Sequence, residues 1–115
     1  MTLILAVLVL SATAAAGLGL AWCHMQGRRV RLPVGLAHAT GGVIGVVLLT
    51  AAALAAGTDY RLNSALICLT LALIGGAFIL IFRLEGDSAP GFMIGLHALA
   101  AISALVLVWL AVLGE

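Results

Sequence analysis

The stretch "CHMQGRRVRLP", residues 23–33, interrupts an otherwise apolar chain and decides its fold. It contains three arginines together with Gly27 and Pro33, residue types that end helices and make turns. Two further polar breaks have the same character: "GTDYRLN" at residues 57–63 and "RLEGDSAPG" at residues 83–91. Each apolar run between the breaks has about 20 residues, the length an α-helix needs to cross the hydrocarbon core of a membrane. We predict helices at about residues 2–22, 34–56, 64–82 and 92–113.

The composition supports a membrane location for the whole chain. Of its 115 residues 65% are hydrophobic and 8% are charged, and the mean hydropathy is +1.35, values far from those of soluble domains. We therefore predict a single transmembrane domain over residues 1–115, with an all-α fold in a lipid bilayer. Short connections between four spans favour an up-and-down four-helix bundle. A net charge of +1 gives no reason to expect a nucleic-acid partner.

The arginines indicate the orientation of this bundle. Three arginines lie within residues 28–31 and Arg83 borders the third break, whereas the second break carries only Arg61. The positive-inside rule then places the first and third breaks in the cytoplasm and both termini outside it. The first apolar run lacks a basic leader and is longer than a signal-peptide core, so we expect it to be retained as a helix. These patterns predict a multi-pass protein of a bacterial-type inner membrane.

The chain also carries an internal repeat. When the sequence is shifted against itself so that His38 falls on His97, Gly17 falls on Gly76 without gaps. The repeat halves, at about residues 1–56 and 60–115, each contain two spans. We therefore predict two tandem helical hairpins related by a pseudo-twofold axis along the membrane normal.

The two histidines of this repeat are the candidate functional residues. His38 follows Pro33 by five residues and His97 follows Pro90 by seven, so each lies roughly 7–10 Å inside the cytoplasmic end of its helix. An ionisable side chain at this depth usually faces the bundle interior and has a function, although one histidine alone also serves as packing glue. Haem iron accepts neutral imidazoles on its two opposite faces. The pair therefore predicts one haem b per chain, with His38 and His97 as its iron ligands.

Small residues surround both histidines, and a macrocycle between helices needs such residues. Gly42 and Gly45 follow His38 by four and seven residues and share its helix face, and Ala101 takes the place of Gly42 after His97. Gly17 and Gly76, on the neighbouring helices, fall in nearly the same layer. Close helix packing of the small-xxx-small type accounts for glycines as well.

The cytoplasmic arginines complete the predicted cofactor site. A haem at this depth extends its propionates toward the cytoplasmic surface. Arg28, Arg31 and Arg83 offer charge-assisted hydrogen-bond donors there. The same arginines already serve to set the topology.

In architecture and in this histidine and glycine pattern, the chain resembles the four-helix b-type membrane cytochromes. The resemblance implies bis-histidine haem ligation and electron transfer, with a quinone or a redox protein as partner. It departs from the respiratory cytochrome b and cytochrome b561 families, which carry paired ligands on a helix for two stacked haems. Each helix here has one such histidine, which supports one haem near the cytoplasmic side.

Other readings remain open beside the cytochrome. The chain has the size of a small multidrug transporter, and those proteins resemble it in their four-helix plan but depend on a carboxylate in the first helix. Here the acidic residues all lie in the breaks or, for Glu115, at the terminus. "CHM" at residues 23–25 offers Cu(I) ligands for a metal transporter or sensor, yet consecutive side chains on a helix diverge by about 100°. Haem transport or sensing would use the same two histidines. A cofactor-free membrane subunit, assembly protein or homodimer also fits.

The sequence gives little support for an enzyme. It has no buried carboxylate pair, no nucleophile constellation and no phosphate-binding loop. With both axial positions of a haem filled, no coordination site is left open for a substrate. We expect an electron carrier rather than a catalyst.

Overall fold

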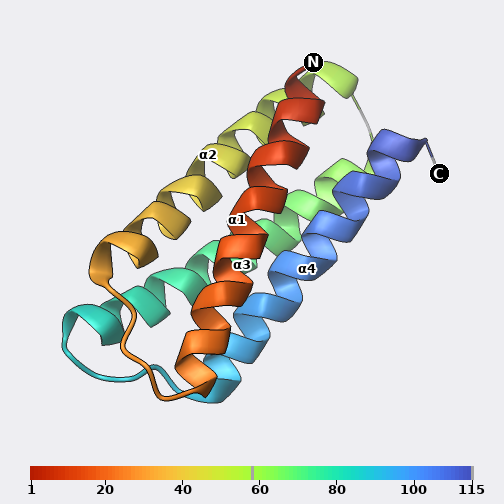
Figure 1. The fold of residues 1–115 in the computed structure, drawn as a ribbon. Coiled ribbons are helices and arrows are strands. Elements are labelled where there is room, and N and C mark those ends of the chain that lie inside the picture. Colours follow the sequence, from red (N-terminus) through yellow and green to blue (C-terminus); the bar gives the residue numbers. More distant parts are fainter. Residues whose placement is uncertain (58, 115) are drawn as a thin grey trace.

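The structure, a computed structural model, describes residues 1–57 and 59–114 and consists of four long helices joined by short turns (Figure 1). The helices are α1 (Thr2–Met25), α2 (Leu32–Ala56), α3 (Tyr60–Leu84) and α4 (Gly91–Leu113). All four are long and apolar enough to cross a membrane, and the long axis of 43 Å matches a bilayer of about 40–45 Å including its headgroups. The predicted fold class, an all-α up-and-down membrane bundle, is confirmed. Glu115 lies outside the described residues.

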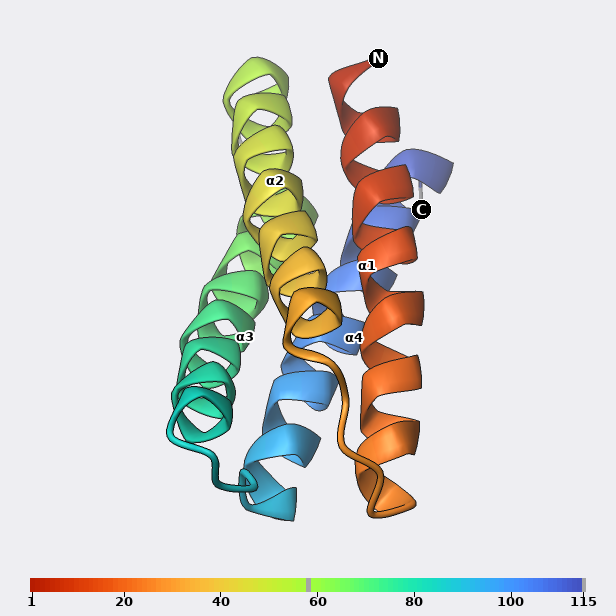
Figure 2. The same cartoon turned by 60° about the vertical axis from the view of Figure 1, so that its left-hand side comes forward.

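Successive helices alternate in direction, so the bundle has two distinct ends. The α1–α2 and α3–α4 turns lie at one end, and both chain termini lie at the other (Figure 1). Each helix packs beside two neighbours, most extensively within the hairpins α1–α2 and α3–α4. Across the diagonals, no Cα atoms of the described residues approach within 8 Å. The second view separates an α2–α3 side from an α1–α4 side (Figure 2). The helices that carry the two histidines, α2 and α4, therefore face each other across the bundle centre.

The helices extend further than the sequence predicts, α1 and α3 by the most. α1 continues past residue 22 through Cys23 and His24, and α3 begins at Tyr60 instead of residue 64. A helix of 24 residues is about 36 Å long, longer than the hydrocarbon core of about 30 Å, so its ends reach the interface where polar residues are tolerated. At the start of α3, the Asp59 carboxylate accepts hydrogen bonds from the backbone N–H groups of the first turn. This side-chain cap explains the early start of α3.

The two hairpins share their turn geometry at the predicted repeat offset. Gly27 ends the first helix of one hairpin with φ +68°, and Gly86 ends the first helix of the other with φ +86°. In each case the glycine N–H donates to a carbonyl of the last helical turn, that of His24 or Arg83. A left-handed conformation at this position suits glycine because it has no Cβ atom.

The core is unevenly distributed along the bundle axis. The largest fully buried side chains are Leu49, Leu62 and Val108, all in the half next to the chain termini. In the half next to the turns, residues 14–44 and 73–102, Ala89 is the only buried residue. Many large apolar side chains in this half are exposed instead, such as Leu18, Phe78 and Leu99. The bundle interior on the histidine side is therefore free of large, fully buried hydrophobic residues.

Candidate functional site

The structure brings the two predicted histidines together at the bundle centre. His38 follows the first residue of α2 by six positions (38 − 32), and His97 follows the first residue of α4 by six (97 − 91). Both side chains are half-buried, their ring centroids are 6.0 Å apart and their planes cross at 77°. The two histidines expected at matched depth from the repeat thus lie close to each other, with their ring planes nearly perpendicular.

Each imidazole is held by a backbone carbonyl of its own hairpin. His38 Nδ1 lies 3.0 Å from the carbonyl oxygen of Thr13 on α1, and His97 Nδ1 lies 2.8 Å from that of Ala72 on α3. A carbonyl oxygen only accepts, so Nδ1 is the donor and, in the neutral ring, Nε2 keeps its lone pair. The two acceptors are themselves related by the repeat offset, so the contact occurs in both hairpins. This arrangement leaves Nε2 of both rings as potential metal ligands.

Two glycines make these hydrogen bonds sterically possible. Side chains on a helix tilt toward its N-terminus, so the carbonyl of residue i lies beneath the side chain of residue i+4. Gly17 follows Thr13 by four residues, and Gly76 follows Ala72 by four. A Cβ atom on Gly17 would lie 2.7 Å from His38 Cε1, and one on Gly76 would lie 3.1 Å from His97 Cε1. Because Gly17 and Gly76 have no side chains, the carbonyls of Thr13 and Ala72 stay accessible and the two imidazole rings have room to pack against them.

The other predicted small residues have different surroundings. Gly42 faces α3, where an added Cβ would meet Leu73 Cδ2 at 3.6 Å, and Ala101 is half-buried on α4. Gly45 is buried and packs directly against Leu10 of α1. Gly45 thus brings α1 and α2 into close contact, two turns further than His38 from the end of the bundle that holds the α1–α2 and α3–α4 turns.

The predicted propionate partners all lie at the turn end of the bundle. Arg28 and Arg31 are exposed in the α1–α2 turn. Arg83, at the end of α3, is half-buried and donates from Nη2 to the carbonyl of Val30. Arg83 thereby links the two hairpins, and its guanidinium keeps further N–H donors for other acceptors.

Sequence reasoning missed the Thr13 and Ala72 carbonyls. A backbone acceptor has no residue signature, so hydropathy and spacing do not reveal it. The available signal was the repeat, because each acceptor precedes its histidine by 25 residues and each is followed four residues later by glycine.

The chemistry of the donor set limits what the pair can bind. Within residues 1–57 and 59–114, no cluster of three or more His, Cys, Asp or Glu side chains is placed to hold a metal ion. Cys23 and His24 of the "CHM" segment belong to no such cluster. A metal at the histidine pair would need its remaining ligands from elsewhere, and a porphyrin supplies four nitrogens in a plane.

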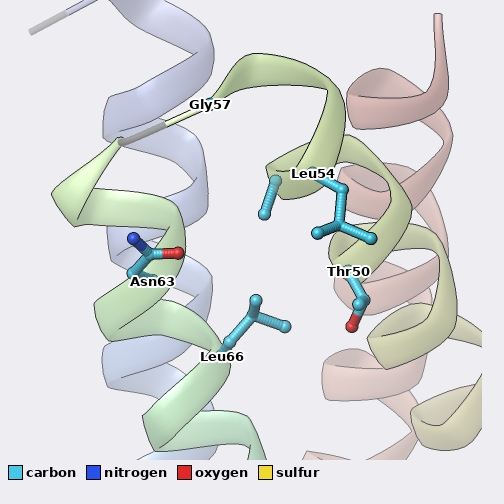
Figure 3. A pocket seen from close by; sticks show the side chains of 6 residues that line it. Thr50, Leu54, Gly57, Asn63 and Leu66 are labelled. Carbon is cyan, nitrogen blue, oxygen red and sulfur yellow. The ribbon is translucent and has the colours of Figure 1, made fainter.

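The surface formed by the described residues has grooves, and two of them are described here. The first, of about 290 Å³, lies between α2 and α3 at the end of the bundle next to the chain termini, with Thr50 on one side and Asn63 on the other (Figure 3). The second, which we call the α3–α4 groove, has a volume of about 550 Å³ and includes His97 in its wall. Of these two grooves, the second reaches the histidine pair.

Comparisons with protein families, curated proteins and solved structures give no match.

Proposed function

We propose that this chain is a small b-type membrane cytochrome in which His38 and His97 ligate one haem b near the cytoplasmic side. The separation of the two rings is the observation that carries the proposal. A metal–imidazole bond of about 2 Å, plus about 1 Å from nitrogen to ring centre, puts two axial imidazoles about 6 Å apart between centroids. The centroids of His38 and His97 are 6.0 Å apart.

The hydrogen bonds to Thr13 and Ala72 support the same role. Metal-ligating histidines almost always donate their second ring N–H to a carbonyl, a carboxylate or water, which fixes the tautomer and the ring orientation. Both rings meet this requirement before any metal is considered. The repeat supplies the same support to each ligand.

The distribution of the core also favours a cofactor. A macrocycle between helices needs an interior without large side chains, and the half of the bundle that contains the histidines has none fully buried among residues 14–44 and 73–102. Gly42 and Ala101 lie one turn further along from the two histidines. At the surface, Arg28, Arg31 and the remaining donors of Arg83 would serve haem propionates.

A bound haem would supply one-electron redox chemistry. Since both axial positions would be filled by His38 and His97, no open site would remain for substrate, and the role is electron transfer with a quinol or a redox protein. With the arginine-rich turns in the cytoplasm, the termini face outward from a bacterial-type inner membrane. The haem would then lie near the inner surface.

The test is spectroscopic. Protein purified in detergent from haem-replete cells should be red, with sharp α and β bands on reduction and about one haem per chain. His38→Ala and His97→Ala should each abolish or shift this spectrum. His24→Ala is the matched control, since His24 lies at the end of α1 and belongs to no potential metal cluster among the described residues.

Two results would contradict the proposal. If the wild-type protein is folded but colourless, the histidines serve only in hydrogen bonds between helices. Unchanged spectra in both single histidine variants would show that a haem is held elsewhere. Circular dichroism of each variant separates loss of haem from loss of fold.

A further inference from the structure

Three arginines lie around one peptide group at the turn end of the bundle. Arg29 and Arg31 flank Val30 in the α1–α2 turn, and Arg83 at the end of α3 donates a hydrogen bond to the Val30 carbonyl. The backbone at Arg31 is extended, and the side chains of Arg29 and Arg31 are exposed while that of Val30 between them is half-buried. Alternate residues of an extended segment lie on the same side. Guanidinium groups from both hairpins are therefore gathered at this point of the surface.

The positive charge of this cluster is not neutralised within the bundle. Among residues 1–57 and 59–114, the one ion pair joins Arg61 to Asp59, near the chain termini. The acidic residues of the turn end, Glu85 and Asp87, are exposed in the α3–α4 turn. At the repeat offset Asp87 takes the place of Arg28, so the two turns carry opposite charges. An anion is therefore attracted to the α1–α2 turn and the end of α3.

The position of the cluster in a bilayer favours a lipid as the source of this anion. With the four helices across a membrane, the turn end lies at the level of the headgroups, where the phosphates of lipids are concentrated. α3 also has an exposed apolar stripe at helical spacing, which ends at Ile81, two residues before Arg83. Its members are Leu71, Ile74, Phe78 and Ile81. A phospholipid would cover such a stripe with its acyl chains, and free phosphate has no group for it.

We infer that Arg29, Arg31 and Arg83 bind the phosphate of one anionic phospholipid whose acyl chains lie along α3. A guanidinium matches a phosphate in geometry and forms two parallel charge-assisted hydrogen bonds with it. Arg83 uses one N–H for the Val30 carbonyl and keeps others for the phosphate. A zwitterionic headgroup brings its own cation, which the cluster repels, so the site selects a headgroup of net negative charge such as phosphatidylglycerol.

This inference goes beyond the proposed function and does not depend on it. Arg31 and Arg83 each have several N–H donors and could serve a haem propionate as well. Arg29 has no part in the proposed haem site, so its substitution tests the lipid alone.

Native mass spectrometry of the purified full-length chain tests the site. The haem-free chain is released from a neutral detergent that contains equal amounts of phosphatidylglycerol and phosphatidylcholine, and the identity of the first bound lipid is measured. Wild type should prefer phosphatidylglycerol. Arg29→Gln and Arg83→Gln should each lower this preference by about fivefold. Arg61→Gln is the matched control, since it removes an arginine at the opposite end, and should keep the preference.

Three outcomes would overturn the site. Equal binding of the two lipids by wild type would show that the charge of the headgroup is not recognised. An unchanged preference in both Arg29→Gln and Arg83→Gln, with normal circular dichroism, would place the lipid elsewhere. Loss of bound phosphatidylglycerol in inorganic phosphate, but not in chloride at the same ionic strength, would assign the arginines to free phosphate.

The two proposals fail separately. Arg29→Gln should leave the spectrum of a bound haem unchanged, and His38→Ala should leave the lipid preference unchanged. A lipid preference without haem would remove the proposed cytochrome alone, and haem without a lipid preference would remove this lipid site alone.

Discussion

Replacing Gly17 with alanine tests how the first histidine is seated. An added Cβ would lie 2.7 Å from His38 Cε1, so the ring must move away from the Thr13 carbonyl that it now contacts at 3.0 Å. Overpacking costs about 1–3 kcal/mol, and an interhelical hydrogen bond in a membrane contributes about 0.6–1.7 kcal/mol. The better helix propensity of alanine offsets about 1 kcal/mol. We expect a net destabilisation of about 1–3 kcal/mol.

Two further glycines turn this estimate into a ranked series. Gly76→Ala places its Cβ at 3.1 Å from His97 Cε1, a milder contact, so its net cost should be about 0–1.5 kcal/mol. Gly19→Ala is the matched control on α1, because nothing lies within 4 Å of its Cβ position. Its effect should lie between zero and about 1 kcal/mol of stabilisation. The predicted order of stability is Gly19→Ala, then Gly76→Ala, then Gly17→Ala.

The assay is equilibrium unfolding in mixed micelles, with increasing dodecyl sulfate and helicity followed by circular dichroism. Using the haem-free chain separates the packing effect from any cofactor. A Gly17→Ala protein as stable as Gly19→Ala would refute the reasoning, since it would show that the His38 ring does not depend on the uncovered carbonyl. If the proposed haem is bound, the spectrum of the Gly17→Ala variant would then report whether the displaced His38 ring still ligates it.

Three further predictions concern packing, capping and orientation. Gly45→Ala should destabilise the chain by about 1–3 kcal/mol, because the added methyl group overpacks against Leu10. A double-mutant cycle with Leu10→Ala should show a coupling energy of about 0.5–3 kcal/mol. Strictly additive effects of the two substitutions would refute this contact. Arg61→Ala removes a 3.1 Å hydrogen bond from Nη1 to the Leu110 carbonyl, so amide hydrogen exchange at the end of α4 should accelerate. An unchanged exchange rate would show that this hydrogen bond does not stabilise the end of α4. A cysteine at Ser88, with both native cysteines removed, should react with an impermeant maleimide only in inside-out vesicles, and labelling of intact cells would reverse the assigned orientation.

The sequence predicts the spans well because hydropathy over about 20 residues overrides local detail. Helix ends depend on local caps, so hydropathy does not reveal the start of α3 at Tyr60, where the Asp59 carboxylate accepts from the first-turn N–H groups. The histidine pair follows from the repeat, since equal depth on two helices is a matter of counting residues. The acceptors at Thr13 and Ala72 do not, because a helical carbonyl becomes available only when a partner side chain approaches in three dimensions.

The contacts of the pair also explain how two copies of a hairpin make one site. His38 is held within the first hairpin by Thr13 and seated on Gly17, and the second hairpin holds His97 in the same way. Each hairpin thus supplies by itself the carbonyl and the glycine that orient its histidine ring. The distance between the two rings depends on how the hairpins pack against each other. The interfaces between hairpins, α2–α3 and α1–α4, are less extensive than those within them. A small rigid-body shift of one hairpin would therefore change the ring separation while both histidine hydrogen bonds stay intact. This division of roles would suit the proposed haem site, in which a flat group would lie between two histidines whose orientation is already fixed.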